Sequence, residues 1–255
     1  MIFAEIAFEK YFRNYLKDKG ITTRALIENA YNGVLEEWKT KPSLDLGGDT
    51  PGVFFEKIYK NGRFADYIVG VFEQNLKIGD ITAEFLASLV DRVNILKEIF
   101  EKDNEKARLF AVEMLSRESQ DDTTEFLADI LFDYAKYGDA VTDGVFDALK
   151  DGRHGLDGLI LKKTDNLKTV TDAALKDMLL DILSGYGANT VVRGLVTEGL
   201  LAGGDVMLYA NLLGRCGGEE SIAVLREYAK SRETSELEYM EIRNAVERLG
   251  GLLDI

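Results

Sequence analysis

Two stretches in the last third of the chain decide its fold: residues 182–195 read ILSGYGANTVVRGL, and residues 212–225 read LLGRCGGEESIAVL. They align without a gap at an offset of 30 residues. In each stretch an apolar segment runs into a glycine-containing joint, and a second segment then opens with paired aliphatic residues. Glycine joints of this kind end helices, and short joints make neighbouring helices antiparallel. Because one helix pair can hide its apolar face only against the next pair, the repeat predicts a helical solenoid.

Helical periodicity is present along nearly the whole chain. Apolar residues recur at i, i+3, i+4 and i+7, which is typical of amphipathic helices, as at Leu127, Ile130, Leu131 and Tyr134. The 255 residues include only two prolines, far fewer than the turns of an all-β protein need. We therefore expect an all-α fold.

The stretch from Leu208 to Gly251 resembles HEAT repeats, particularly those of the bilin-lyase type. It carries Leu213-Gly214 with Gly217 at a helix end, and Ile242, Arg243 and Ala245 in the following inner helix. The resemblance is clearest over residues 169–251 and is looser over residues 121–168. It implies an α-α superhelix, a HEAT-like solenoid of antiparallel helix pairs that usually offers its concave side to another protein. Ser184-Gly185 departs from the family pattern, which has Leu-Gly at that point.

The first part of the chain shows no such repeat. We expect residues 1–120 to form a divergent helical part, either a cap or a separate subdomain, and residues 121–255 to form the HEAT-like repeats. In the first part, Gly20 is placed to end the first helix. Thr50 and Pro51 favour a helix that starts near residue 50 and runs to about Lys60. The segment from Trp38 to Gly52 is predicted to be an ordered loop, with a partner surface around Trp38 as the functional alternative.

Charge limits the classes of partner. The chain carries 45 acidic and 31 basic residues, a net charge of −14, and the excess lies mostly beyond residue 120, where 25 acidic residues face 14 basic ones. A field of this sign repels nucleic acid and anionic membrane surfaces, so we expect neither as a partner. We expect another protein, and a basic one would suit the acidic surface. With a single cysteine and no uninterrupted signal-peptide core at its start, the chain is expected in the cytoplasm.

Residues with catalytic or metal-binding chemistry are scattered. Carboxylates spaced by four form two runs, Glu125, Asp129 and Asp133, then Asp139, Asp143, Asp147 and Asp151. We interpret these as solvated helix faces, since a Ca²⁺ cage needs converging oxygens; a dock for a basic partner is the alternative. His154, with Asp151, Arg153 and Asp157 near it, is expected to be a surface-loop residue. Cys216 is expected to be a small buried apolar residue at a helix end. We predict no cofactor and no metal site.

The function predicted from these patterns is a protein-binding or scaffolding module. If the bilin-lyase-type phasing holds, four polar residues of the inner helices are the candidate contact residues: Asn211, Arg215, Tyr239 and Arg243. They can equally make contacts within the chain, for example from Arg243 to a turn carboxylate of the adjacent unit. The enzymatic alternatives are a HEAT-like DNA glycosylase and a bilin lyase. Both are disfavoured, the first by the acidic charge and the second because no pigment-specific residue pattern is visible.

Overall fold

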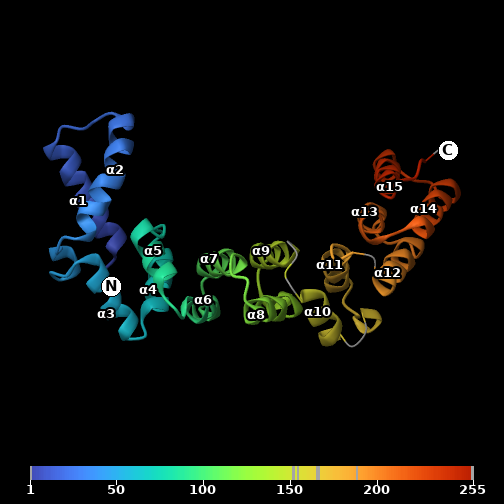
Figure 1. The fold of residues 1–255 in the computed structure, drawn as a ribbon, viewed down its shortest axis with the longest axis horizontal. Helices are drawn as coiled ribbons and strands as arrows, with labels where there is room; N and C mark the ends of the chain where they lie inside the picture. Colours follow the sequence, from blue (N-terminus) through green and yellow to red (C-terminus); the bar gives the residue numbers. More distant parts are fainter. Residues whose placement is uncertain (1, 151–152, 154, 165–166, 188, 254–255) are drawn as a thin grey trace. The chain divides into compact units, whose positions relative to one another are not determined.

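The protein is all-helical. A computed structural model describes residues 2–150, 153, 155–164, 167–187 and 189–253. Within these residues there is no β-strand, only an isolated antiparallel bridge between Ser43 and Asp49. The chain divides into two compact units, residues 1–118 (unit 1) and residues 119–255 (unit 2), coloured blue to green and green to red in Figure 1.

The structure describes residues 2–118 of unit 1, and they form seven α-helices and one short 3-10 helix. Their bounds are α1 Ala4–Asp18, α2 Arg24–Lys39, η1 Leu44–Leu46, α3 Pro51–Lys60, α4 Phe64–Glu73, α5 Asp80–Ser88, α6 Arg92–Glu101 and α7 Glu105–Ser116. Helix α1 ends as predicted, because Gly20 lies beyond it in the left-handed region, with φ of 64°. Helix α3 also begins as predicted, with Pro51 as its first residue and the Thr50 hydroxyl accepting a hydrogen bond from the Val53 N–H.

An aromatic core holds unit 1 together. Phe55 of α3 and Phe64 and Tyr67 of α4 are fully or almost fully buried. The ring of Phe85 from α5 lies 5.3 Å from both phenylalanine rings, and the Tyr67 ring lies 5.6 Å from that of Phe55. Edge-to-face and tilted packing at such distances adds to the burial of these large side chains. The core therefore joins α3, α4 and α5.

The expectation for Trp38 was wrong. The loop was predicted to begin at this residue, but α2 continues to Lys39 and Trp38 lies in its last turn. Its side chain is only 1% exposed, which excludes it as part of a partner surface. The reason is the spacing of Val34, Leu35 and Trp38, which extends the apolar stripe of α2 by one more turn into the core. The shorter loop that follows is ordered by η1 and by the Ser43–Asp49 bridge.

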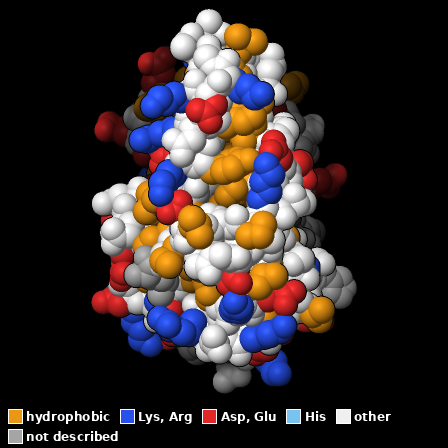
Figure 2. Space-filling view, turned by 90° about the vertical axis from the view of Figure 1, so that its left-hand side faces the viewer, with side chains coloured by type: hydrophobic (Ala, Val, Ile, Leu, Met, Phe, Trp, Pro, Cys, Tyr) orange, Lys and Arg blue, Asp and Glu red, His pale blue; other side chains and the backbone are white. Residues whose placement is uncertain are grey.

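The hairpin of α1 and α2 has an accessible apolar face. On the side of unit 1 seen in Figure 2, hydrophobic side chains form a band in the upper half, flanked mainly by Lys and Arg. The apolar side chains of the two helices that are exposed or half-buried are Ile6, Phe8, Tyr11, Phe12, Tyr15, Leu16, Ala25, Leu26, Ile27, Ala30 and Tyr31.

Within its described residues, unit 2 contains eight α-helices and two short 3-10 helices. Their bounds are α8 Asp121–Phe132, η2 Tyr134–Lys136, α9 Asp139–Lys150, α10 Leu156–Thr164, η3 Leu167–Thr169, α11 Ala173–Ser184, α12 Thr190–Leu201, α13 Val206–Cys216, α14 Glu219–Ser231 and α15 Glu236–Arg248. The predicted glycine joints at residues 185–187, 203–205 and 217–218 all lie between consecutive helices. The predicted helix pairs are therefore confirmed in this part of the chain.

The helices of unit 2 stack in a solenoid-like arrangement. Each of α11, α12 and α13 packs on the helix that follows it and also on the helix after that, and α14 packs on α15. Two rows result: α9, α11, α13 and α15 form one row, and α12 and α14 form the other (Figure 1). Equivalent positions of the two aligned stretches, Ile182 and Leu212 at one helix end and Leu195 and Leu225 in the next helix, are all buried. The repeat in the sequence thus corresponds to stacking of apolar faces between neighbours.

Among the helices that the structure describes, none is both long and apolar enough to cross a membrane.

Removal of the Thr50 cap tests the start of α3. Thr50→Ala is expected to lower the free energy of unfolding by about 1 kcal/mol, because the N–H of Val53 loses its acceptor. Urea denaturation followed by circular dichroism measures the change. Thr23→Ala is the matched control, since Thr23 caps α2 by position but its side chain makes no cap hydrogen bond. Equal losses for the two variants would contradict the assignment.

Candidate interaction surface

One carboxylate connects three successive helices of the longer row. Asp181 lies in the last turn of α11 and is only 9% exposed. One of its oxygens accepts a hydrogen bond from the Lys150 amino group at 2.8 Å, from the end of α9. The other forms an ion pair with the guanidinium of Arg215 in α13, which also donates to the backbone carbonyl of Asp181 at 2.9 Å. A buried carboxylate is tolerated where several donors compensate its lost hydration, as these do.

Further polar contacts extend the same row. The Tyr209 hydroxyl of α13 donates to Asp177 of α11 at 2.6 Å, and the Asn211 amide of α13 donates to Glu241 of α15 at 2.8 Å. Burial, together with the nearby Asp177 carboxylate, raises the pKa of Tyr209 well above its usual value, so the hydroxyl stays protonated and donates. These contacts and those of Asp181 join residues separated by 30 to 34 positions, the period of the repeat.

Helices α13 and α15 approach each other closely. A Cβ at Gly214 would lie 2.9 Å from the Cα of Ala245, so only glycine allows this distance between the backbones. The Gly214–Ala245 and Asn211–Glu241 contacts share an offset of 30 or 31 residues and run in the same direction along both helices. In this register the start of α13, which contains Met207, and the start of α15, which contains Leu237, lie at the same end of the helix pair.

The four candidate contact residues differ in their surroundings. Asn211 and Arg215 are half-buried and are engaged within the chain, with Glu241 and Asp181 respectively. Tyr239 is half-buried on α15. Arg243 is exposed and pairs with Glu247 of its own helix at 2.7 Å, not with a turn carboxylate of the adjacent unit. The structure therefore brings Asn211 and Arg215 into the contacts between stacked helices and leaves Arg243 on the surface.

Three apolar side chains that the sequence did not indicate as contact residues lie near the starts of α13 and α15. Met207 of α13 is 43% exposed, and Leu237 and Met240 of α15 are 64% and 52% exposed. We call these three residues the α13–α15 edge. The exposed carboxylate of Glu236 and the cap carboxylates of Asp205 and Glu238 begin the same two helices. The edge is thus apolar with acidic neighbours, and such a surface suits contact with another protein.

The other candidate residues are accounted for or lie outside the described residues. Glu125, Asp129, Asp133, Asp139, Asp143 and Asp147 are all exposed, as expected for solvated helix faces. Among the described residues, no group of carboxylates, cysteine or histidine is arranged to hold a metal ion. His154 and Asp151 lie outside the described residues.

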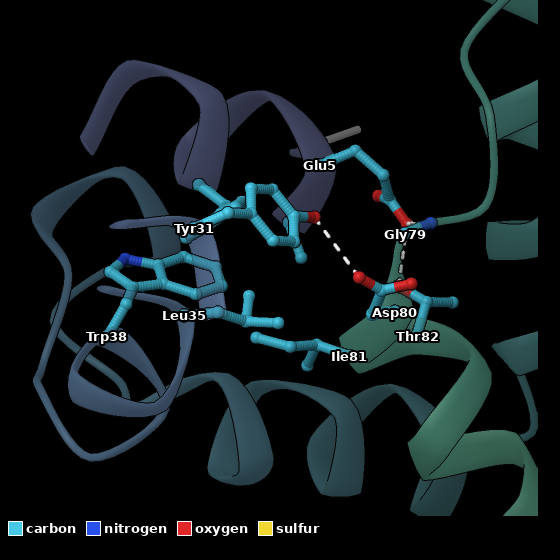
Figure 3. A pocket seen from close by; sticks show the side chains of 10 residues that line it. Glu5, Tyr31, Leu35, Trp38, Gly79, Asp80, Ile81 and Thr82 are labelled. Carbon is cyan, nitrogen blue, oxygen red and sulfur yellow. Dashed lines mark hydrogen bonds between the residues drawn. The ribbon is translucent and has the colours of Figure 1, made fainter. Parts of the chain in front are cut away.

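A small cavity lined mostly by apolar side chains, with a polar end at Glu5, Asp80 and Thr82, lies in unit 1 beside Trp38 (Figure 3). Its volume is about 30 Å³, enough for roughly one water molecule. At its polar end, the Glu5 carboxylate accepts hydrogen bonds from the hydroxyls of Tyr67 at 2.5 Å and Thr82 at 2.6 Å. Burial, then the Glu5 charge, raises the pKa of Tyr67 far above its usual value, which keeps this hydroxyl protonated as a donor. The cavity therefore reflects a packing network that joins α1, α4 and α5, and its size is too small for a substrate.

Comparison with known proteins adds no relative. No family of proteins, no curated protein and no solved structure matches this chain. The resemblance to HEAT repeats stays a prediction.

Loss of the Asp181 carboxylate tests the connection between α9, α11 and α13. Asp181→Ala is expected to lower the free energy of unfolding by about 2 to 3 kcal/mol, because the half-buried Arg215 and the Lys150 amino group lose their shared acceptor. Asp133→Ala, which breaks an exposed ion pair with Lys136, is the matched control, with an expected loss below about 1 kcal/mol. Urea titrations of both variants measure the difference. Similar small losses would show that the Asp181 contacts contribute little.

The reactivity of the Cys216 thiol tests whether the end of α13 is packed in the folded protein. Cys216 is fully buried, and burial raises its pKa, so little reactive thiolate is present at neutral pH. We expect no adduct with iodoacetamide in the folded protein and one adduct per chain in urea, measured by intact mass. Because the chain has one cysteine, the mass shift identifies the site. Rapid alkylation of the folded protein would contradict the packing around α13.

Proposed function

We propose that this chain is a protein-binding scaffold whose unit 2 is built from HEAT-like repeats. The observation that carries the proposal is the α13–α15 edge, where Met207, Leu237 and Met240 remain 43%, 64% and 52% exposed on helices that are otherwise tightly packed. Accessible methionine and leucine side chains on a rigid surface are typical of protein contacts, because methionine adapts to the shape of a partner.

The contacts between helices explain why this edge suits a scaffold. The hydrogen bonds from Tyr209 to Asp177 and from Asn211 to Glu241 join successive helices side to side. The edge is therefore displayed on elements whose spacing is set by packing, and little conformational entropy is lost when a partner binds. Preorganisation of this kind favours recognition of one partner geometry.

Charge indicates the chemistry of the partner. Acidic side chains neighbour the edge at Asp205, Glu236 and Glu238, and the part of the chain beyond residue 120 has 25 acidic and 14 basic residues. A partner segment that places apolar side chains on the edge and basic side chains on its rim would gain both burial and charge complementarity. We propose the cytoplasm as its location, where the lone thiol of Cys216 would remain reduced.

Aspartate substitutions on the edge test this function. The intact chain is used to capture partners from an extract of its source, and a partner recovered in stoichiometric amount is purified for calorimetry. The double variant Met207→Asp/Met240→Asp is expected to weaken the binding of that partner by a factor of about ten or more. Two apolar contacts are replaced by charges that the neighbouring carboxylates repel.

The matched control is Val191→Asp/Leu252→Asp. These residues are also apolar and exposed, at 52% and 63%, but neither belongs to α13 or α15. The control is expected to bind like the unmodified chain, and circular dichroism checks that both variants fold. Absence of a stoichiometric partner, or equal losses for the two variants, would overturn the proposed function.

A further inference from the structure

The distal part of the α1–α2 hairpin lacks a core. From Phe8 to Gly33 no residue is buried, although both helices carry apolar residues at helical spacing in this range. The remaining ends of the hairpin are covered: Ala4 and Ala7 of α1 and Val34, Leu35 and Trp38 of α2 are buried in unit 1. The apolar stripes of the two helices thus continue beyond the part of the unit that covers them.

The ring contacts of this part lie within the hairpin, apart from its covered end, where the Tyr31 hydroxyl donates to Asp80 of α5 at 3.2 Å. The Phe12 ring stacks on Phe8 at 5.8 Å and meets the edge of Tyr31 at 5.5 Å. Tyr15, Leu16 and Ile27 remain half-buried, and Leu26 is 53% exposed. Two helices alone cannot enclose a core, because each hides only one side of the other's stripe. By contrast, α6 has five buried residues within ten positions, since helices of unit 1 pack on it from more than one side.

Basic residues surround this apolar surface. Residues 8–33 contain five basic side chains, Lys10, Arg13, Lys17, Lys19 and Arg24, and three acidic ones, Glu9, Asp18 and Glu28, which gives a local charge of +2. Glu9 and Glu28 pair with Arg13 and Arg24. All five basic residues are exposed, in a chain whose net charge is −14. Figure 2 shows the result as a hydrophobic band flanked mainly by Lys and Arg. The local charge is therefore opposite in sign to that of the whole molecule.

We propose that the distal α1–α2 hairpin is a docking site for an acidic amphipathic helix of a partner protein. Two antiparallel helices leave a groove along which a third helix can bury an apolar stripe and complete a three-helix bundle. Glutamate and aspartate on the flanks of that helix would face the five basic residues, which gives the charge complementarity.

The charge and the ring packing favour this occupant over two others. Pairing of two identical hairpins would bring like-charged rims together, which opposes a two-fold dimer. Insertion into an anionic bilayer would need aromatic side chains that project outward, whereas the rings of Phe8 and Phe12 both meet the Tyr31 ring across the hairpin. This site lies in unit 1 and is independent of the α13–α15 edge, so either proposal can fail without the other.

A synthetic helix serves as the probe. It has about 18 residues, or five turns, with Leu at i, i+3, i+4 and i+7 and Glu on the other faces, and carries a fluorescent label. The intact chain is expected to raise its anisotropy in a saturable titration that weakens with added salt, because the contact is partly electrostatic. The same helix with Lys in place of every Glu is expected not to bind.

Two variants with matched controls locate the site. Tyr15→Asp/Leu26→Asp removes exposed apolar surface, and Arg13→Glu/Lys17→Glu reverses the charge of the rim; each is expected to weaken binding by a factor of about ten or more. Leu44→Asp and Lys60→Glu, exposed residues of the same unit outside the hairpin, are the controls and are expected to leave binding unchanged.

Four outcomes would overturn the proposal. They are absence of binding, equal binding of the Glu and Lys probes, sedimentation with phosphatidylserine vesicles in place of probe binding, and a dimer in light scattering that the hairpin variants abolish. The third would assign the surface to a membrane and the fourth to a second copy of this chain. Because all four substituted hairpin residues are at least partly exposed, the variants are expected to fold, which circular dichroism verifies.

Discussion

The stacked half of this chain depends on one constraint: each helix can cover its apolar stripe only against other helices, both the adjacent one in the chain and the next but one. The Asp181 carboxylate makes this constraint specific at one point, because it needs donors from both sides and obtains them from Lys150 of α9 and Arg215 of α13. Apolar stripes can slide past each other at small cost, whereas a buried carboxylate loses its compensation if its donors move away. Burial thus stacks the helices, and the polar contacts define their register.

In unit 1 the apolar sides of the helices are covered in a different way. Its core is formed by large aromatic rings from α3, α4 and α5 in place of the repeated aliphatic side chains of unit 2. Here too a half-buried carboxylate, Glu5, receives donors from two other helices, through Tyr67 and Thr82. In both units a single acidic side chain with several donors ties together elements that hydrophobic burial alone would place only approximately.

Two accessible apolar surfaces with opposite surroundings result from these packing solutions. The α13–α15 edge has acidic neighbours, and the distal α1–α2 hairpin has a basic rim. On the edge, Met207, Leu237 and Met240 project from helices whose other sides are covered. In the hairpin the surface arises from the lack of a third helix. We propose that these opposite charges select different partners, so that the chain holds two proteins at once.

The repeat at an offset of 30 residues was sufficient to predict helix pairs and their stacking, since helix periodicity, glycine joints and the need for cover are all local properties of the chain. Thr50, Pro51 and Gly20 likewise predicted helix ends, because capping depends on neighbouring residues alone. Which side of each helix stays accessible was decided only by the tertiary structure. For Asn211 and Arg215 the sequence left a partner surface and contacts within the chain as equal alternatives, and the structure shows contacts within the chain, with Glu241 and Asp181, 30 and 34 positions away. The burial of Glu5 and Trp38 and the exposure of Met207 were likewise decided by residues distant in sequence. A periodic pattern defines an apolar stripe on a helix, and only the packed neighbours decide how much of that stripe is covered.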